Sequence, residues 1–412
     1  MKRFAPWTLL LVTVLVIVVP FAFAAATAQP AGATRSDRSP GAPIATALST
    51  ITGVAISPLL GTGAYGMYQW IKAENDALRA KLPWYARPSF WIPALLLVAI
   101  CAAKDAFGAT VPTGLKKPLD VLETIENKFS GLIAAGAVVP FALDAMAKLL
   151  FDTSQAAPVV ATGTPGVAGL AMVQLAAIDL TWLVNILTVP FGMAVFLLVW
   201  LASHSINVLI LLSPWGAIDA ALKIGRTALL GLVTIAATMN PWIGAALSVV
   251  VIIMAYFVSG WAFRLTVFGA VFCWEFVTRR CRRFRLEPDG NRMFAGAAFA
   301  QVPVRTYGRL QRKEDGLEFV YRPWLVGQPN VARVETQTRD LAVSEGAFFS
   351  DVVDGESRTL FSLPPRYRGH EAEIVSTYGL GGGVRPAGLR KAWGALREMV
   401  GGRAVKKEPL AA

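Results

Sequence analysis

Two stretches of this chain contain no charged residue over an unusual length, Leu180–Ile218 with 39 residues and Thr227–Phe263 with 37. Because a helix rises about 1.5 Å per residue, one helix over the longer stretch would measure roughly 58 Å. The hydrocarbon core of a bilayer is about 30 Å thick, and about 20 apolar residues cross it. Each stretch therefore predicts two membrane crossings, or one crossing with an interfacial or re-entrant segment.

Residues that interrupt helices divide both stretches. Pro214 and Trp215 predict the break in the first stretch, and Asn240, Pro241 and Trp242 predict the break in the second. Four other uncharged runs predict further membrane segments. Two of them are long enough for one crossing each, and two shorter ones predict tilted half-spans, interfacial helices or crossings lengthened by their flanks. In the same order, these runs are Ser39–Ile71 and Thr153–Ile178, then Pro88–Ala103 and Phe129–Leu143.

The overall composition agrees with a membrane protein. Hydrophobic residues make up 55% of the 412 residues, charged residues make up 16%, and the mean hydropathy is +0.51. An average soluble domain has about 25% charged residues. Three cysteines and two histidines are too few for a disulfide framework, a zinc ribbon or a histidine-based catalytic cluster. We therefore expect no metal, no cofactor and no enzymatic activity.

The N-terminus is typical of an export signal. A positively charged start precedes an uncharged, mostly aliphatic stretch, Ala5–Val19, and small residues at 26–28 match the pattern that signal peptidase cleaves. We expect a signal peptide over residues 1–28 and a flexible exported linker over residues 29–43. Cleavage after Ala24 and retention of the segment as a first membrane helix are the alternatives.

A cluster of arginines follows the last apolar segment and sets the predicted orientation. Basic residues beside a membrane helix stay on the cytoplasmic side, so we expect a multi-pass protein of the bacterial inner membrane with a cytoplasmic C-terminus. The membrane domain then covers residues 44–278 with five or seven crossings, or an even number if the first helix is retained. A basic juxtamembrane segment covers residues 279–293. Its arginines are Arg279, Arg280, Arg282, Arg283 and Arg285.

Short alternating segments replace the long apolar runs from about Phe294 onward. Apolar residues alternate along Leu317–Tyr321, directly after Asp315-Gly316, a dipeptide suited to a hairpin turn. Asp354-Gly355 predicts a second hairpin between residues 348–353 and 359–363. These patterns indicate antiparallel strands.

An amphipathic helix from Pro386 to Gly401 is the last predicted element. Short antiparallel strands closed by one such helix resemble a pleckstrin-homology-type barrel in element order. The whole arrangement resembles bacterial polytopic membrane proteins of unknown function, through "LILLSPWGAIDAALK", "MNPWIGAAL" and "VPVRTYGRL". The resemblance implies a membrane location and no activity. The residue patterns and the arginine cluster predict a cytosolic barrel-plus-helix module over residues 294–401, before a flexible tail over 402–412. The predicted fold class is mainly α, a polytopic helical bundle with a smaller C-terminal β-rich domain.

Polar residues in or beside the central apolar stretches are the candidate functional residues of the membrane domain. An ionisable side chain inside a bilayer costs about 2.5–3.5 kcal/mol on insertion scales, so such residues are often functional. One interpretation is a path for a proton, an ion or a solute. The other places them at helix ends, or in hydrogen bonds between helices. The residues are Asp179, Asn185, His204, Asn207, Asp219 and Glu275.

The arginine run Arg279–Arg285 also has two interpretations. Basic residues near a charged leaflet attract anionic lipids by about 1 kcal/mol each, so the run could contact lipid headgroups. It could instead only fix the orientation of the last helix. No nucleic-acid partner is expected, because no recognition motif accompanies the basic residues. The glycine-rich segment Tyr378–Pro386 lacks the Gly-Lys-Ser/Thr of a phosphate loop and predicts a flexible hinge.

These observations predict a structural or regulatory role in the inner membrane. The helical bundle would anchor the cytosolic module and present it to a protein partner or to anionic lipid. A homo-oligomer is compatible with this role. The alternative is a transporter or channel with a polar path through the bundle.

Overall fold

The computed structural model describes residues 42–106, 121, 123–136, 181–213, 216–287, 289–314, 316–346 and 350–386. The predicted signal peptide, most of the predicted linker, nearly all of the predicted terminal helix and the tail lie outside these ranges. The chain divides into two compact units. We call Met1–Ile206 with Gly216–Ser259 the helical unit, and Asn207–Trp215 with Gly260–Ala412 the sheet unit.

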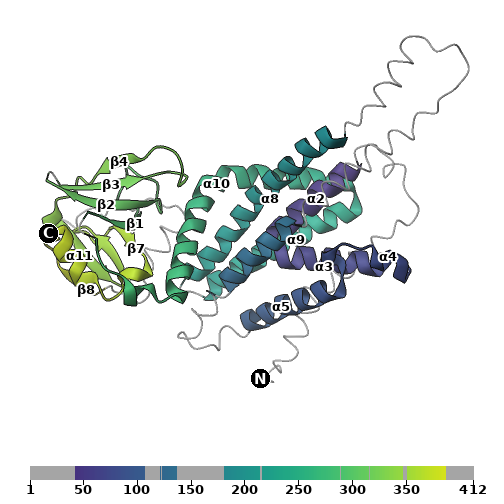
Figure 1. Cartoon of the computed structure of the whole chain (residues 1–412), viewed down its shortest axis with the longest axis horizontal. Helices are drawn as coiled ribbons and strands as arrows, with labels where there is room; N and C mark the ends of the chain where they lie inside the picture. The colour runs from purple at the N-terminus through teal and green to yellow at the C-terminus, as the bar shows by residue number, and fades with distance from the viewer. Residues whose placement is uncertain are drawn as a thin grey trace, which may run out of the picture. The chain divides into compact units, whose positions relative to one another are not determined.

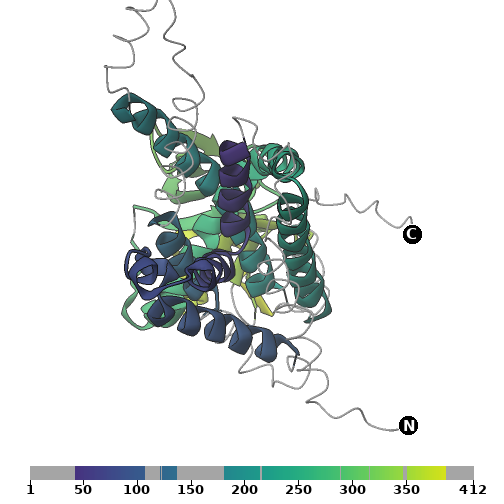
Figure 2. The same cartoon turned by 90° about the vertical axis from the view of Figure 1, so that its right-hand side faces the viewer.

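Helices of very different lengths make up the described part of the helical unit. Two of them, α8 and α10, continue into the sheet unit. Helices α2 and α9 lie side by side, and α3 packs against α5 (Figure 1, Figure 2). In chain order the elements are α2 (Ala42–Ile56), α3 (Pro58–Lys72), α4 (Asp76–Ala80), η2 (Trp84–Ala86), α5 (Pro88–Ala106), a helical stretch over 123–136, α8 (Thr181–Leu212), α9 (Gly216–Met239) and α10 (Pro241–Val277).

Three of the described helices are long and apolar enough to cross a membrane: Val189–Leu212 in α8, Ile218–Met239 in α9, and α10. The uncharged run Ser39–Ile71, which predicted one crossing, is divided at Ser57 into α2 and α3. Each of these helices has 15 residues, which corresponds to roughly 22 Å and is shorter than the hydrocarbon core. Pro58 starts a new helix, so the described structure has two short helices here in place of one long one.

The predicted breaks in the long runs are confirmed. Helix α8 ends at Leu212 and α9 begins at Gly216, on either side of the predicted Pro214-Trp215 break. Helix α10 begins at Pro241, and the Oδ1 atom of Asn240 accepts a hydrogen bond from the backbone N–H of Trp242 at 2.8 Å. Asn240 thus satisfies one of the free N–H groups at the start of the helix.

Helix α10 has 37 residues and contributes to both units. Its first part, Pro241–Ser259, exposes many large apolar side chains. Its second part, Gly260–Val277, buries most of one side against the sheet unit, although the sequence extended the membrane domain to residue 278. The exposed residues of the first part include Val249, Val250, Ile253, Met254, Tyr256, Phe257 and Val258; the buried residues of the second include Ala262, Leu265, Phe268, Phe272, Cys273 and Glu275.

One eight-stranded sheet forms the centre of the sheet unit, in the order β4-β3-β2-β1-β7-β6-β5-β8. Neighbouring strands are antiparallel, except that β5 and β8 are parallel. The described part of the chain is therefore mixed, with helices first and a sheet in the C-terminal part. The strands are β1 (Asn291–Ala295), β2 (Tyr307–Lys313), β3 (Gly316–Tyr321), β4 (Asn330–Arg333), β5 (Ala342–Glu345), β6 (Ser350–Val353), β7 (Thr359–Leu363) and β8 (Val384–Pro386).

Both predicted hairpins are confirmed. Strands β2 and β3 pair from Lys313 with Gly316 outward, and the φ of Gly316 is +132°, a conformation that glycine adopts readily. In the β6–β7 hairpin, the Asp354 carboxylate accepts hydrogen bonds from the backbone N–H groups of Glu356 and Arg358 at 3.0 and 2.8 Å. This turn geometry follows from local residues, which explains why the sequence could predict it.

The glycine-rich segment before Pro386 is part of the sheet unit and does not form the predicted hinge. Gly379 ends helix α11 (Glu371–Tyr378) with a φ of +63°, and β8 then pairs with β5. A side chain at Gly382 would collide with Ala342, 2.7 Å from its ideal Cβ position. The glycines therefore allow close packing here. Pro386, which was predicted to begin the terminal helix, is the last residue of β8. Helix α11, which precedes the glycines, was not predicted.

Candidate functional site

The second part of α10 carries a buried ion pair with the sheet unit. Glu275 is only 2% exposed and Arg366, in the short 3-10 helix η5 (Pro365–Tyr367), is 8% exposed. The Glu275 carboxylate accepts a hydrogen bond from the backbone N–H of Arg366 at 3.0 Å and another from its guanidinium. Arg366 also donates to the hydroxyl of Tyr307 at 3.1 Å. Both carboxylate oxygens of Glu275 are therefore hydrogen-bonded.

This pair also shifts the pKa of its basic partner. Burial is the largest single influence and lowers the pKa of Arg366, but the hydrogen bond with Glu275 and the nearby charged groups together raise it by more, so the net pKa lies above its ordinary value. Arg366 is therefore held charged. A buried charge that loses its partner is strongly destabilising, so this pair fixes η5 to the end of α10.

Other contacts along the same part of α10 reinforce this attachment. The Arg264 Nε–H donates to the backbone carbonyl of Val304 at 3.0 Å. The rings of Phe268 and Phe294 lie 4.7 Å apart, in a small cluster that also contains Leu265. Near the start of this part, the rings of Phe263 and Trp324 lie 4.9 Å apart. The sheet unit thus contacts α10 repeatedly over its last four to five turns.

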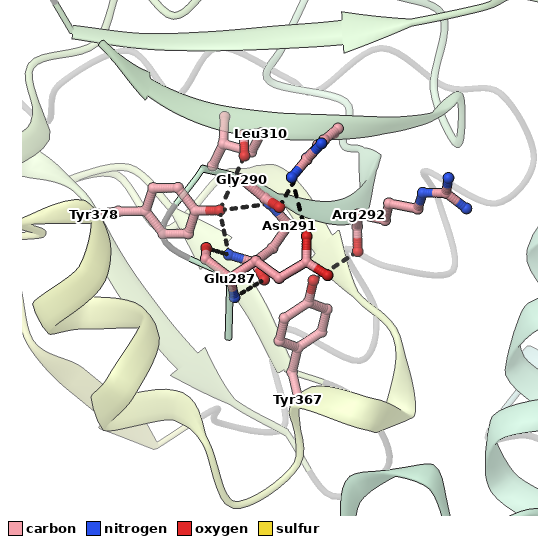
Figure 3. A network of polar contacts seen from close by, with 8 residues as sticks. Glu287, Gly290, Asn291, Arg292, Leu310, Tyr367 and Tyr378 are labelled. Atoms are coloured by element: carbon pink, nitrogen blue, oxygen red, sulfur yellow. Dashed lines mark hydrogen bonds and ion pairs between the residues drawn. The ribbon is translucent and has the colours of Figure 1, made fainter. Parts of the chain in front are cut away.

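A second polar network fixes the segment between α10 and the sheet (Figure 3). The hydroxyl of Tyr378 accepts hydrogen bonds from the backbone N–H and the side-chain amide of Asn291, at 3.0 and 2.9 Å. The same hydroxyl donates to the carbonyl of Leu310 at 3.0 Å. Asn291 in turn exchanges two hydrogen bonds with the backbone of Glu287. One hydroxyl of α11 therefore connects β1, β2 and the preceding segment.

The arginine run lies between α10 and this network. Helix α10 ends where Arg279 takes a left-handed conformation with a φ of +47°, and the short helix η3 (Arg280–Arg283) follows. The Cys281 carbonyl faces the Nε2 atom of His370 at 3.0 Å. All five predicted arginines are exposed, and none makes an ion pair with another described residue. They are Arg279, Arg280, Arg282, Arg283 and Arg285.

The helical unit contains its own buried polar group. His204, fully buried in α8, places Nδ1 2.9 Å from the Oδ1 atom of Asn127, and its ring stacks on Trp200 with centroids 5.1 Å apart. The Nε2 atom of His204 has no hydrogen-bond partner among the described residues. Glu123, four residues before Asn127, forms an ion pair with Lys223 of α9 at 2.9 Å. The helical stretch over 123–136 thus makes polar contacts with both α8 and α9.

Two of the predicted path residues have printed partners outside the predicted set. His204 pairs with Asn127, and Glu275 pairs with Arg366 within the sheet unit. Asn207 and Asp219 are buried in α8 and α9, and both have interactions of their own. Asp179 lies outside the described residues, as does the side chain of Asn185.

Several residues of these sites were missed by sequence reasoning. Glu123 and Asn127 are four residues apart, a spacing that places both on one side of a helix, and this signal could have been used. Lys223 is the charged residue nearest the start of α9 after Asp219, and a pairing search could have considered it. Arg366 and Tyr307 gave no usable signal in the sequence. Arg366 is 91 residues from Glu275 and 59 residues from Tyr307, so their contacts depend on how distant segments pack.

No cluster in the described ranges contains three or more histidine, cysteine, aspartate or glutamate side chains placed to hold a metal ion. Comparisons of the chain with protein-family models, with curated proteins and with solved structures found no match.

Proposed function

We propose that this protein is an integral protein of the bacterial inner membrane that anchors its sheet unit on the cytoplasmic side and presents it to a partner. In this proposal the helical unit holds the protein in the bilayer. The sheet unit is the part that the partner recognises. No chemical step is assigned to either unit.

One observation carries the proposal: α10 runs without a break from an apolar, exposed part into a part that belongs to the core of the sheet unit. The first part has 19 residues, about the length that crosses a bilayer. The second part is attached through the buried pair of Glu275 and Arg366. This pair attaches the second part of α10 to η5 of the sheet unit, which suits an anchored recognition surface.

The arginine run is the recognition surface that we propose. Its five exposed arginines lie within seven residues, next to the C-terminal end of α10. Arginine forms planar, paired hydrogen bonds with carboxylates and phosphates. An acidic surface on a partner protein, or a layer of anionic lipid, has the required charge.

Membrane insertion is tested by extracting isolated membranes with alkaline carbonate. The full chain should remain in the pellet, because apolar helices in the bilayer are not released by high pH. Protease added to intact spheroplasts should leave the sheet unit uncut. Release of the chain by carbonate, or digestion of the sheet unit in intact spheroplasts, would contradict the proposal.

Recognition is tested in membranes with the full chain. Arg283 is replaced by a photo-crosslinking residue, and adducts are identified by mass spectrometry. A protein or lipid adduct should disappear when the other four arginines are changed to glutamine. The matched control changes exposed basic residues elsewhere in the sheet unit to glutamine and should keep the adduct; these are Lys313, Arg339, Arg368 and Arg385. Equal adducts in both variants would show that the run is not the recognition surface.

A polar path through the helical unit is the second candidate function. It is favoured by one observation, the full burial of His204 with Nε2 unpartnered among the described residues. Proteoliposomes containing the protein should then conduct protons, and His204→Gln or Asp179→Asn should reduce the flux. Protein that gives the same flux as empty liposomes would exclude this function for protons.

A further inference from the structure

Helix α10 is much longer than a membrane crossing requires. Its 37 residues correspond to roughly 55 Å, against about 30 Å for the hydrocarbon core. If its C-terminal end marked the membrane surface, Arg264 and Glu275 would lie within the lipid layer, together with the strands packed on them. The first part alone, Pro241–Ser259, corresponds to roughly 28 Å. The physical length therefore favours a membrane surface near Gly260.

An exposed apolar loop of the sheet unit lies at this level of α10. The loop joins β3 to β4, and residues 322–331 are all exposed. Its tip is Trp324, Leu325 and Val326, which are 52%, 44% and 71% exposed. Leu325 has a φ of +62°, a conformation that is uncommon for a side chain of its size. Three neighbouring apolar side chains displayed in this way indicate an interaction surface.

The position of the loop on α10 is set by two contacts. The Trp324 ring lies 4.9 Å from the ring of Phe263, and its outer edge lies 4.0 Å from the position that a Cβ atom at Gly260 would take. The exposed side chains of Phe257 and Val258 come less than one turn before Gly260. The loop tip thus packs beside the start of the second part of α10, at Gly260 and Phe263.

Basic residues flank this surface. Arg322 precedes the loop tip and is exposed, and Arg333 follows it on β4. Arg264 lies one residue beyond Phe263 on α10. A tryptophan with its ring in an apolar layer, and arginines next to it, is the arrangement that membrane-interface segments share.

We propose that the β3–β4 loop is a membrane-interface anchor: Trp324, Leu325 and Val326 insert into the headgroup and upper acyl region of the bilayer beside α10. This inference rests on the proposed function, because it requires α10 to cross the membrane. The partner of the loop is the lipid surface, and the flanking arginines favour an anionic one. The sheet unit is then held at the bilayer by two attachments, the helix and the loop.

A membrane surface near Gly260 also leaves the arginine run at a distance from the lipid. Arg279 comes 19 residues after Gly260, roughly 28 Å along α10. The Debye length at physiological salt is about 8 Å, so a helix that continues outward would hold these arginines beyond the reach of the headgroup charge. The lipid contact of the sheet unit is assigned to the loop, and the arginine run remains for an acidic protein surface.

Spin labels on the full chain in nanodiscs of phosphatidylcholine and phosphatidylglycerol test this inference. The three native cysteines are changed to alanine, and one cysteine is introduced by Val326→Cys, Phe257→Cys or Arg283→Cys. Power-saturation spectroscopy then measures contact of each label with oxygen, which concentrates in lipid, and with a water-soluble nickel chelate. Thermal unfolding confirms that each labelled protein is folded.

The expected result is that the labels at 257 and 326 contact oxygen and that their nickel contact is several-fold lower than that of the label at 283. Trp324→Ser should raise the nickel contact at 326 and leave 257 unchanged. Nickel contact at 326 equal to that at 283, with 257 in lipid, would overturn the loop anchor and leave the proposed function intact. Nickel contact at 257 would overturn both. Oxygen contact at 283 as strong as at 326 would refute the assigned membrane level.

Discussion

Phe257 and Phe268 project from nearly the same side of α10, because eleven residues correspond to about three helical turns. Phe257 is 80% exposed, whereas Phe268 is 5% exposed and packs on Phe294. Their local sequences are equally apolar. The comparison shows that hydropathy reports how much a helix avoids water, without telling whether lipid or protein covers it.

The strongest test of this comparison breaks the attachment of the second part of α10. Glu275→Leu leaves the charge of Arg366 buried without its partner, so the sheet unit should lose about 3–5 kcal/mol of its free energy of unfolding. The double change Glu275→Leu with Arg366→Met should recover most of that loss, because it removes both charges. Pulse proteolysis in urea, on the full chain in detergent micelles, measures the difference.

Glu287→Leu is the matched control for that prediction. Glu287 pairs with Arg309 at 3.0 Å, but its side chain is largely exposed, so the change should cost less than about 1 kcal/mol. Equal losses for Glu275→Leu and Glu287→Leu would mean that the buried pair does not attach η5 to the helix.

The second test uses the two phenylalanines themselves. Phe268→Ala should destabilise the sheet unit by about 3 kcal/mol, because it removes a buried ring and leaves a cavity. Phe257→Ala, on the same side of the helix, should change the stability of the sheet unit by less than about 0.5 kcal/mol. The same proteolysis assay measures both, and similar values for the two variants would remove the distinction between the two parts of α10.

A smaller effect is expected in the network that supports the start of β1. Tyr378→Phe removes the hydroxyl that serves Asn291 and Leu310, so buried polar groups lose their partner and stability should fall by about 2 kcal/mol. Tyr321→Phe is the control, since the Tyr321 hydroxyl makes no hydrogen bond with the described residues. An unchanged urea midpoint in Tyr378→Phe would contradict the role of this hydroxyl.

The smallest expected effect is a dependence of the folding stability on pH, caused by the titration of His370. Its two ring nitrogens face acceptors, the Cys281 carbonyl at 3.0 Å and the Glu373 carboxylate at 3.1 Å. The carbonyl and then the charge of Glu373 raise the pKa of His370, against partial desolvation. Because the folded pKa exceeds the unfolded value, the protonated ring contributes stability that is complete below the unfolded pKa, about 6.5, and is lost as pH rises through the folded pKa.

Urea midpoints of the wild type and His370→Gln, measured at a series of pH values from acidic to alkaline, check this prediction. The wild type should be the more stable protein on the acidic side, and the difference should shrink as the pH rises. A difference that grows toward alkaline pH would contradict the sign of the effect.

Local signals explain which parts of the fold could be predicted. The breaks at Asn240-Pro241 and Pro214 and the hairpins at Gly316 and Asp354 depend on residues next to one another in the chain. The short helix α11 was missed because its eight residues carry little apolar periodicity. The glycines before β8 were interpreted as a hinge, since sequence alone does not show that Ala342 packs against them.

Charge-free runs and turn residues act over short distances, so they suffice to predict that long apolar helices precede a strand-rich part. Tertiary packing set three further features: the second part of α10, nearly half of the helix, belongs to the sheet unit, Glu275 pairs with Arg366, and His204 pairs with Asn127. Those partners are 91 and 77 residues apart. Their meeting depends on how whole elements pack, and an apolar run has the same composition whether lipid or a sheet covers it.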